Sequence, residues 1–257
     1  GVKMIKILVA LSLLVSIVLA HTSSDTKPVD VFCKYYVDDE RGYVAKCDDV
    51  KLADQSQHVR FTGVQVEKKT NEDVKFLDIV PPSDIKFFPS KDIFTYYVGL
   101  QNVEACNVNI EKLDFIANCY ELVNITLSNN RISEIEVDTF FMCRDLLFLD
   151  LSYNQIKEIH ENTFSQPSNL IELNLSINRI EKLTRKHFKP IKKLRKINLH
   201  ANNIQKLSHD IFNDLFDLTS LDLSQNPIIS LDSRFFDFVM FLEDLNLSGT
   251  NLRKFLP

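Results

Sequence analysis

Residues 146–178 read LLFLDLSYNQIKEIHENTFSQPSNLIELNLSIN, and the motif that opens this stretch starts again at Leu170. The unit is Leu-x-x-Leu-x-Leu-x-x-Asn-x-Leu-x-x-Leu-x4-Phe, with Ile accepted at the Leu positions, and it repeats every 24 residues. Its first position recurs at Leu122, Leu146, Leu170, Leu194, Leu218 and Leu242. Self-similarity at a fixed period of this length is typical of a leucine-rich repeat solenoid, in which each unit forms one coil.

The spacing of the apolar residues explains why each coil folds in this way. The alternation Leu149-Asp150-Leu151 predicts a short strand with one buried face. Strands of successive coils then pair in parallel along the concave side. One coil cannot bury its own apolar face, so stability comes from its neighbours. The predicted fold is an α/β-type solenoid, a leucine-rich repeat horseshoe with a parallel concave β-sheet and an irregular convex side that has no regular helix.

Two further columns of the repeat fill the rest of each coil. A buried Asn amide has donors and an acceptor, so a column of Asn can satisfy the backbone groups that each turn leaves unpaired. This structural column consists of Asn130, Asn154, Asn178, Asn202 and Asn226, with Thr250 in the last unit. A column of stacked rings fills the convex side and consists of Phe140, Phe164, Phe188, Phe212 and Phe236.

The same period predicts two degenerate units upstream of Leu122. Subtracting 24 places Val98, Val103, Cys106 (in the Asn column), Val108 and Ile116, with Gln101 where an apolar residue belongs. Subtracting 24 again places Val74, Leu77, Ile79 and Pro82. We therefore expect eight units: two degenerate, five regular and one terminal. The predicted segments are a signal peptide (1–20), a flexible segment (21–31), a cap hairpin (32–58), degenerate repeats (59–121) and regular repeats (122–257).

Composition excludes several classes of function. The chain has 257 residues, 45% of them apolar, and a formal net charge of −5, which argues against a nucleic-acid partner. Its five Gly are too widely separated for a dinucleotide fingerprint, a phosphate loop or a Gly-x-Ser-x-Gly nucleophile elbow. The six His share no metal-ligand spacing, so we expect neither a metal nor a cofactor. His200, Asp222 and Ser224 are the nearest approach to a catalytic set, and concave polar residues form such trios routinely, so we expect no enzyme.

The N-terminus predicts secretion. Lys3 and Lys6 precede an apolar run over 7–20 that ends in a small residue, which is typical of a cleaved signal peptide. The alternative is a transmembrane helix, but the run is shorter than the roughly 20 residues that cross a bilayer. We therefore expect an extracellular mature chain without a membrane span.

Because a secreted chain enters an oxidising compartment, its five cysteines are expected to include disulfides. Cys33 and Cys47 lie in two strand-like segments that flank an acidic turn, which predicts a disulfide-closed hairpin. Cys119 and Cys143 occupy equivalent positions in adjacent coils, close enough for a bridge, but parallel side chains favour two buried thiols there. Cys106 is interpreted as a structural thiol.

These features together resemble secreted arthropod leucine-rich repeat proteins. The same repeat type occurs in Toll-like receptor ectodomains and Slit-like guidance and adhesion proteins. The cap residues Phe32-Cys33, Gly42-Tyr43 and Cys47, followed by degenerate units, are most similar to insect leucine-rich immune proteins. The resemblance covers 32–257 and lacks the C-terminal cysteine cluster and coiled coil common in that family. It implies a secreted recognition protein of insect-type innate immunity that binds protein or microbial ligands; the alternative is a fragment of an adhesion, guidance or Toll-like receptor ectodomain.

The outward strand positions predict where a ligand binds. Phe148 and Tyr153 are aromatic where the repeat has polar residues, so they are candidate anchors on the concave face, although scattered exposed aromatics are also common. The predicted ligand-binding residues are Phe148, Asp150, Tyr153, Glu172, Asn174, Lys196, Asn198 and His200. The mixed charge suits a protein partner, such as a microbial surface protein or an immune effector.

Other surface features offer alternatives. A basic run, most of it on the convex arc, could hold a polyanion or be a solvated face; it comprises Lys182, Arg185, Lys186, Lys189, Lys192, Lys193, Arg195 and Lys196. Asn124, Asn174 and Asn246 are glycosylation sequons, and glycans there would cover the concave face. The apolar last unit predicts self-association through an uncapped C-terminal end, or a truncated sequence.

Overall fold

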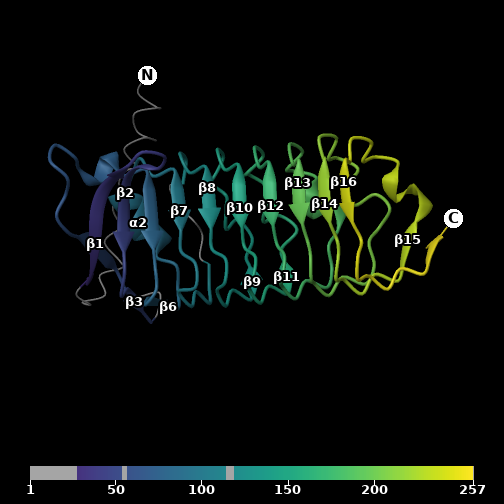
Figure 1. The fold of residues 1–257 in the computed structure, drawn as a ribbon, viewed down its shortest axis with the longest axis horizontal. Coiled ribbons are helices and arrows are strands. Elements are labelled where there is room, and N and C mark those ends of the chain that lie inside the picture. Colours follow the sequence, from purple (N-terminus) through teal and green to yellow (C-terminus); the bar gives the residue numbers. More distant parts are fainter. Residues whose placement is uncertain (1–27, 54–56, 114–118, 257) are drawn as a thin grey trace, which may run out of the picture.

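The computed structural model describes residues 28–53, 57–113 and 119–256, so the predicted signal peptide lies outside the described residues. The chain forms an elongated solenoid with one sheet along a single face (Figure 1). The sheet is parallel throughout except where β1 pairs antiparallel with β2. Its order is β4 (Val59–Thr62), β1 (Val29–Asp38), β2 (Gly42–Cys47), β5 (Phe76–Ile79), β7 (Asn102–Glu104), β8 (Asn124–Thr126), β10 (Phe148–Asp150), β12 (Glu172–Asn174), β13 (Lys196–Asn198), β14 (Ser220–Asp222) and β16 (Asp244–Asn246).

The remaining elements are short and are not strands of this sheet. Among the described residues, three two-stranded sheets pair β3 with β6, β9 with β11 and β15 with β17. Their bounds are β3 (Lys51–Leu52), β6 (Asp84–Ile85), β9 (Glu134–Ile135), β11 (Glu158–Ile159), β15 (Ser230–Asp232) and β17 (Lys254–Leu256). The helices are η1 (Asn71–Asp73), α2 (Ser90–Tyr96), α3 (Arg185–Phe188) and η2 (Ser233–Phe236). The predicted leucine-rich repeat solenoid with a parallel sheet is confirmed.

The Asn column closes the regular coils with hydrogen bonds. The Asn178 side chain donates from Nδ2 to the carbonyls of Leu151 (2.9 Å), Leu175 (3.1 Å) and Ser176 (3.2 Å). Its Oδ1 accepts from the backbone N–H of Ile156 at 2.9 Å. Since Leu151 and Ile156 belong to the preceding coil, each amide joins two coils. Asn130, Asn154, Asn202 and Asn226 make the corresponding bonds.

The Phe column differs from the prediction at its last member. Phe140 stacks on Phe164 with ring centroids 6.2 Å apart, and Phe188 packs on Phe212 at 5.1 Å. The ring that packs on Phe212 from the next coil is Phe235, at 5.9 Å, rather than the predicted Phe236. Both residues lie in η2, and Phe236 contacts Phe235 while remaining partly exposed. Within η2 the buried ring is Phe235, at 2% exposed, so the 24-residue spacing misses it by one residue.

The cap hairpin confirms the first predicted disulfide. Cys33 in β1 faces Cys47 in β2 across the antiparallel pair, and their sulfurs are bonded. The strand β1 is longer than predicted: it begins at Val29, where β4 pairs with it. Tyr35 reaches from β1 to Tyr97, and their hydroxyls are 2.9 Å apart in the buried interior. The hairpin is therefore joined to the solenoid as the start of the same sheet.

The predicted register is wrong in one degenerate unit. The pairing of Asn102 with Asn124 shows that this coil is two residues shorter than the repeat. The buried residue at the first position is therefore Leu100, whereas the predicted Val98 is 58% exposed. The pairing of Phe76 with Asn102 shows that the coil before it is two residues longer than the repeat, which offsets the shift. The predicted Val74, Leu77 and Ile79 are therefore all buried. The predicted Ile116 lies outside the described residues.

The same shift moves Cys106 out of the Asn column. Cys106 lies beside Ser128, whose hydroxyl contacts the thiol sulfur at 3.3 Å. Val108 occupies the Asn position instead, and its backbone N–H donates to Asn130 Oδ1 at 3.1 Å. Partial burial raises the pKa of the Cys106 thiol, because the thiolate would lose solvation there. Among the described residues Cys106 is the free cysteine, and it remains a neutral thiol.

The prediction of buried thiols at Cys119 and Cys143 is also wrong. The two cysteines form a disulfide with their Cα atoms 4.8 Å apart. The expectation assumed parallel side chains, as in neighbouring strands. Neither residue lies in a strand, however: both precede their strands in the turns of adjacent coils, where the backbone directs the side chains towards each other. The bridge joins the last irregular coil, which contains Cys119, to the first regular coil, which contains Cys143.

Candidate functional site

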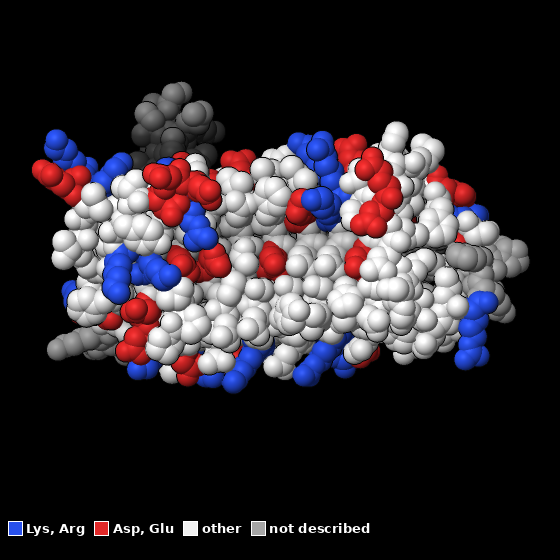
Figure 2. Space-filling view, in the orientation of Figure 1, with Lys and Arg blue, Asp and Glu red and all other residues white. Residues whose placement is uncertain are grey.

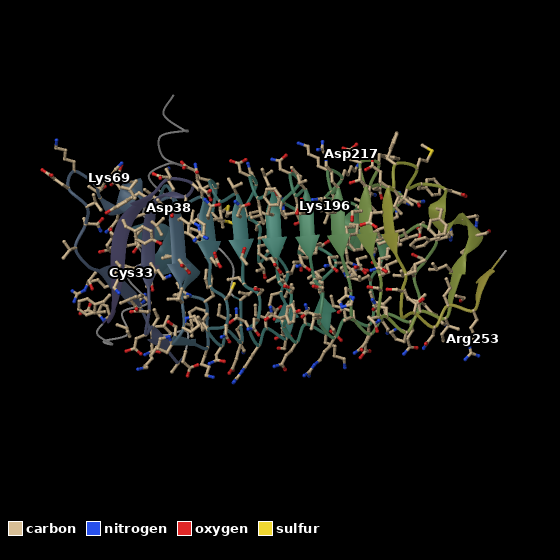
Figure 3. The ribbon with its side chains drawn as sticks, in the orientation of Figure 1. Cys33, Asp38, Lys69, Lys196, Asp217 and Arg253 are labelled. Carbon is tan, nitrogen blue, oxygen red and sulfur yellow. A yellow bond between two sulfur atoms is a disulfide. The ribbon has the colours of Figure 1, made fainter. Side chains whose placement is uncertain are left out.

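The outward positions of the sheet form two rows across the concave face. In β10, β12 and β13 the middle residue is buried and its two neighbours face outward. Register places Phe148, Glu172 and Lys196 side by side in the first row. It also aligns Asp150, Asn174 and Asn198 in the second row. Six of the predicted ligand-binding residues therefore lie together, and Figure 3 shows Lys196 among the side chains over these strands.

A shallow groove runs over this face from β8 to β16. Its outward lining residues are Thr126, Phe148, Asp150, Glu172, Asn174, Lys196, Asn198, Ser220, Asp222 and Asp244. Ser220, Asp222 and Asp244 were not among the predicted ligand-binding residues. The 24-residue spacing from Glu172 and Asn174 reaches these three positions, so the sequence signal for the longer groove was present.

The charges in the groove do not cancel. Lys196 Nζ lies 2.8 Å from Glu172 Oε1, so the ammonium that was expected to attract a partner is already paired. The other carboxylates accept from neutral donors: Asp150 from the Ser152 N–H at 2.8 Å and Asp244 from the Ser220 hydroxyl at 3.3 Å. Figure 2 shows acidic atoms spaced along the middle of this face. The groove is therefore acidic.

Tyr153 is not among the lining residues of the groove and lies in the loop after β10, on an unusual backbone. It is 54% exposed and has a φ of 54°. The equivalent position is left-handed in every regular coil: Asn129, Tyr153, Ile177, Ala201, Gln225 and Gly249 all have positive φ. This conformation favours Gly and Asn and disfavours a β-branched residue such as Ile177, whose φ is 53°. Two neighbouring coils thus present large apolar side chains where the backbone favours small ones.

Three overlapping segments, residues 121–180, 159–204 and 192–252, match the family described as leucine rich repeat. Together they span 121–252, just over half of the chain. The chain belongs to the leucine-rich repeat family. No curated protein sequence matches it at a significant level.

Solved structures similar to this leucine-rich repeat chain include Toll-like receptor complexes. One is the complex of TLR13 with the single-stranded RNA ssRNA13, at 26% identity and a TM-score of 0.67, covering 77% of this chain and 29% of that one. Another is the glycosylated Toll–Spatzle complex of Drosophila, at 20% identity and a TM-score of 0.67, covering 81% and 31%. The leucine-rich repeat chain thus spans less than a third of the length of these receptor chains. At 20% identity, the similarity to the Drosophila Toll chain shows a shared fold alone.

The side chains of His200, Asp222 and Ser224 lie together in the structure, but their hydrogen bonds do not activate Ser224 as a nucleophile. Ser224 Oγ lies 2.7 Å from His200 Nδ1 and also bonds Asp222 Oδ1. A hydroxyl has one proton, and the carboxylate can only accept it, so Ser224 donates to Asp222 and accepts from His200. In this arrangement the hydroxyl proton of Ser224 points to Asp222 and not to His200. Ser224 is also 1% exposed, which keeps it from a substrate.

The three sequon asparagines all lie on concave strands and make side-chain contacts there. Asn124 Nδ2 donates to Asn102 Oδ1, and Asn246 Nδ2 donates to Asp222 Oδ2 at 3.1 Å. Asn174 lies between Asp150 and Asn198 in the second row, and its Oδ1 accepts from the Ser176 N–H at 3.1 Å. A glycan on Asn174 would therefore cover the middle of the groove.

Acidic neighbours neutralise part of the basic run. Arg185 Nε lies 2.6 Å from Asp214 Oδ2, and Lys186 Nζ lies 2.8 Å from Glu161 Oε2. The Arg185 guanidinium lowers the pKa of the Asp214 carboxyl, and the Lys186 ammonium lowers that of Glu161. Because these ion pairs use cations of the run within the chain, the convex arc offers a polyanion less charge than the sequence suggests.

Two other kinds of site are absent from the part of the chain that the structure describes. Within 28–53, 57–113 and 119–256, no group of three or more His, Cys, Asp or Glu side chains is arranged to hold a metal ion. Over the same ranges, no helix is long and apolar enough to cross a membrane.

Proposed function

We propose that the chain is an extracellular recognition protein that binds a protein or microbial surface ligand on its concave face, in an innate-immune role. The observation that carries the proposal is the groove lined by Phe148, together with Tyr153, which is exposed in the loop that follows the same strand. Phe148 is 37% exposed and Tyr153 is 54% exposed. Exposed aromatic side chains on a surface that is otherwise polar are the residue types that dominate binding energy.

The sheet supports this role because it holds the side chains in a fixed grid. Phe148, Glu172 and Lys196 lie on strands whose backbones are paired on both sides. A partner can therefore engage several side chains with little loss of conformational entropy in the chain. The ion pair between Glu172 and Lys196 further restricts two of them.

The compartment and the immune role have separate support. Both disulfides, Cys33–Cys47 and Cys119–Cys143, are of the kind that persists in an oxidising environment. The similar structures include a Toll complex described as a hub in Drosophila development and innate immunity. The likeness to Toll-like chains also favours a second candidate, a piece of a cell-surface receptor ectodomain; sequencing the complete transcript distinguishes the two.

The test removes both aromatic anchors. The Phe148→Ala/Tyr153→Ala variant should lose at least about 2 kcal/mol of affinity, roughly thirtyfold in Kd, because exposed aromatic anchors dominate binding energy. Its fold should remain intact, because neither residue belongs to a core column. Biosensor titration measures this against a partner captured from body fluid. The matched control, Phe216→Ala/Phe241→Ala, removes two exposed aromatic side chains outside the groove and should bind normally.

The opposite result would relocate the site. If the aromatic variant binds unchanged while reversing the charges of Lys186, Lys189, Lys192 and Lys193 abolishes binding, the convex arc is the binding surface and the concave proposal is wrong.

A further inference from the structure

The groove has an excess of negative charge that its own lining residues do not neutralise. Its charged lining residues are Asp150, Glu172, Lys196, Asp222 and Asp244. Lys196 pairs with Glu172 at 2.8 Å, which leaves three carboxylates. Their hydrogen-bond donors are neutral: the Ser152 N–H for Asp150, the Ser224 N–H and hydroxyl and the Asn246 amide for Asp222, and the Ser220 hydroxyl for Asp244. These bonds orient the carboxylates and leave their charge in place.

Apolar side chains border one of these carboxylates, that of Asp150. Phe148 and Asp150 are the two outward residues of β10, so the ring lies next to the carboxylate on one strand. Tyr153 follows on the far side of Asp150 in the same coil, and Ile177 holds the equivalent position in the next coil. A cation that reaches Asp150 would therefore lie beside the Phe148 side chain. The chain itself shows such a contact, since the Arg41 guanidinium lies 4.5 Å from the centre of the Phe76 ring.

We propose that the groove binds a cationic segment of a protein partner, with Arg or Lys side chains on Asp150 and Asp222 and apolar side chains against Phe148 and Tyr153. This inference rests on the proposed concave-face function and adds the chemistry of the partner. Charge complementarity favours a basic segment, and the same carboxylates repel polyanions such as RNA or sulfated glycans.

The geometry also sets the spacing of the basic residues. Asp150 in β10 and Asp222 in β14 occupy the same row, separated by β12 and β13. Strands about 4.8 Å apart put the two carboxylates about 14 Å from each other. An extended chain covers that distance in about four residues. A segment that crosses the strands therefore presents its two basic side chains four positions apart.

The experiment selects peptides on the immobilised full chain from a random phage-displayed dodecapeptide library. Enriched peptides are then synthesised, and fluorescence polarisation measures their Kd for four proteins. These are the wild type, the groove variant Asp150→Asn/Asp222→Asn, the aromatic variant Phe148→Ala/Tyr153→Ala and the control Asp145→Asn/Asp217→Asn. The control removes the same charge at two exposed positions outside the groove. Asn at position 222 keeps one acceptor oxygen for the Ser224 bonds and loses the oxygen that accepts from the Asn246 amide, so thermal unfolding verifies the fold of each variant.

We expect enriched peptides to carry Arg or Lys pairs four residues apart. The groove variant should weaken their binding about tenfold, and the control less than about twofold. Added salt should weaken binding to the wild type, because it screens exposed charges.

The other outcomes overturn either this inference alone or the function as well. If the enriched peptides are neutral or acidic, and their affinity falls in the aromatic variant but not in the groove variant, the cationic inference is wrong and the concave site stands. Basic peptides weakened equally by the control show general attraction to an acidic chain, which also overturns the inference. No enrichment, or peptides indifferent to both the groove and aromatic variants, overturns the inference and the concave site together.

Discussion

The coils from residue 122 onward and the coils before residue 113 share one sheet, but different interactions close them. In the later coils, a buried Asn amide joins each turn to the preceding coil. In the earlier coils, Val108 and Pro82 occupy the Asn position. There the backbone pairs directly: the Asp84 N–H donates to the Val50 carbonyl at 2.8 Å and the Ile85 N–H to the Val108 carbonyl at 2.7 Å. Parallel strands therefore fix the sheet, while the turns can be satisfied in more than one way.

The two regions also differ in how they are anchored. The hairpin of the earlier region is bridged by Cys33–Cys47, and a buried aromatic group including Tyr35, Phe61 and Tyr97 fills its interior. Burial raises the pKa of the Tyr97 hydroxyl well above its ordinary value. The later coils have stacked Phe rings and repeating amides instead. A regular repeat thus obtains its stability from identical neighbours, and an irregular one needs covalent bonds and individual contacts.

The largest expected effect concerns the boundary between the regions. The Cys119→Ala/Cys143→Ala variant should lose about 3.5 kcal/mol of unfolding free energy, because the bridge closes a loop of 24 residues in the unfolded chain. Urea unfolding followed by circular dichroism measures the change. Cys106→Ala, which removes a free thiol, is the matched control and should change stability by less than about 1 kcal/mol. Equal stability of the double variant and the wild type would contradict a stabilising bridge.

A smaller effect compares the two ways of closing a coil. Asn178→Ala should cost about 2–3 kcal/mol, because it leaves the buried N–H of Ile156 without its acceptor. Val108→Ala, at the same position of an early coil, removes only apolar contacts and should cost about 1–2 kcal/mol. Hydrogen exchange should become faster at Ile156 in the first variant. Protection of Ile156 as in the wild type would show that another acceptor replaces the amide.

The smallest effect concerns the left-handed position of each coil. The early coil has Asn107 at a φ of 57°, whereas the later coils place Tyr153 and Ile177 on the same conformation. Ile177→Asn should raise the unfolding free energy by about 1 kcal/mol, because Asn adopts this backbone with less strain. Ala201→Asn is the control and should gain less, since Ala is not β-branched. Thermal unfolding compares the two, and a loss of stability in Ile177→Asn would mean that the contacts of the Ile side chain outweigh the strain.

Residue spacing is sufficient to predict the regular coils and most of the concave site. The 24-residue period alone places the core columns, the Asn amides and the outward residues Phe148, Asp150 and Glu172. The early coil is misaligned by the same period because Val98 and Leu100 both suit an apolar column. A shift of two residues preserves the alternation of a strand, so periodicity alone cannot distinguish the two registers. The choice depends on which residue the neighbouring coils bury.

The sequence by itself determined that this chain is a leucine-rich repeat solenoid, because the period specifies which side chains are buried whatever the detail of the turns. Only the tertiary structure decided the features that depend on direction and distance between coils. It brought Cys119 and Cys143 into bonding distance, since the turns before the strands direct their side chains together. It also paired Lys196 with Glu172, because parallel register places residues 24 apart side by side, and that pairing leaves the groove acidic.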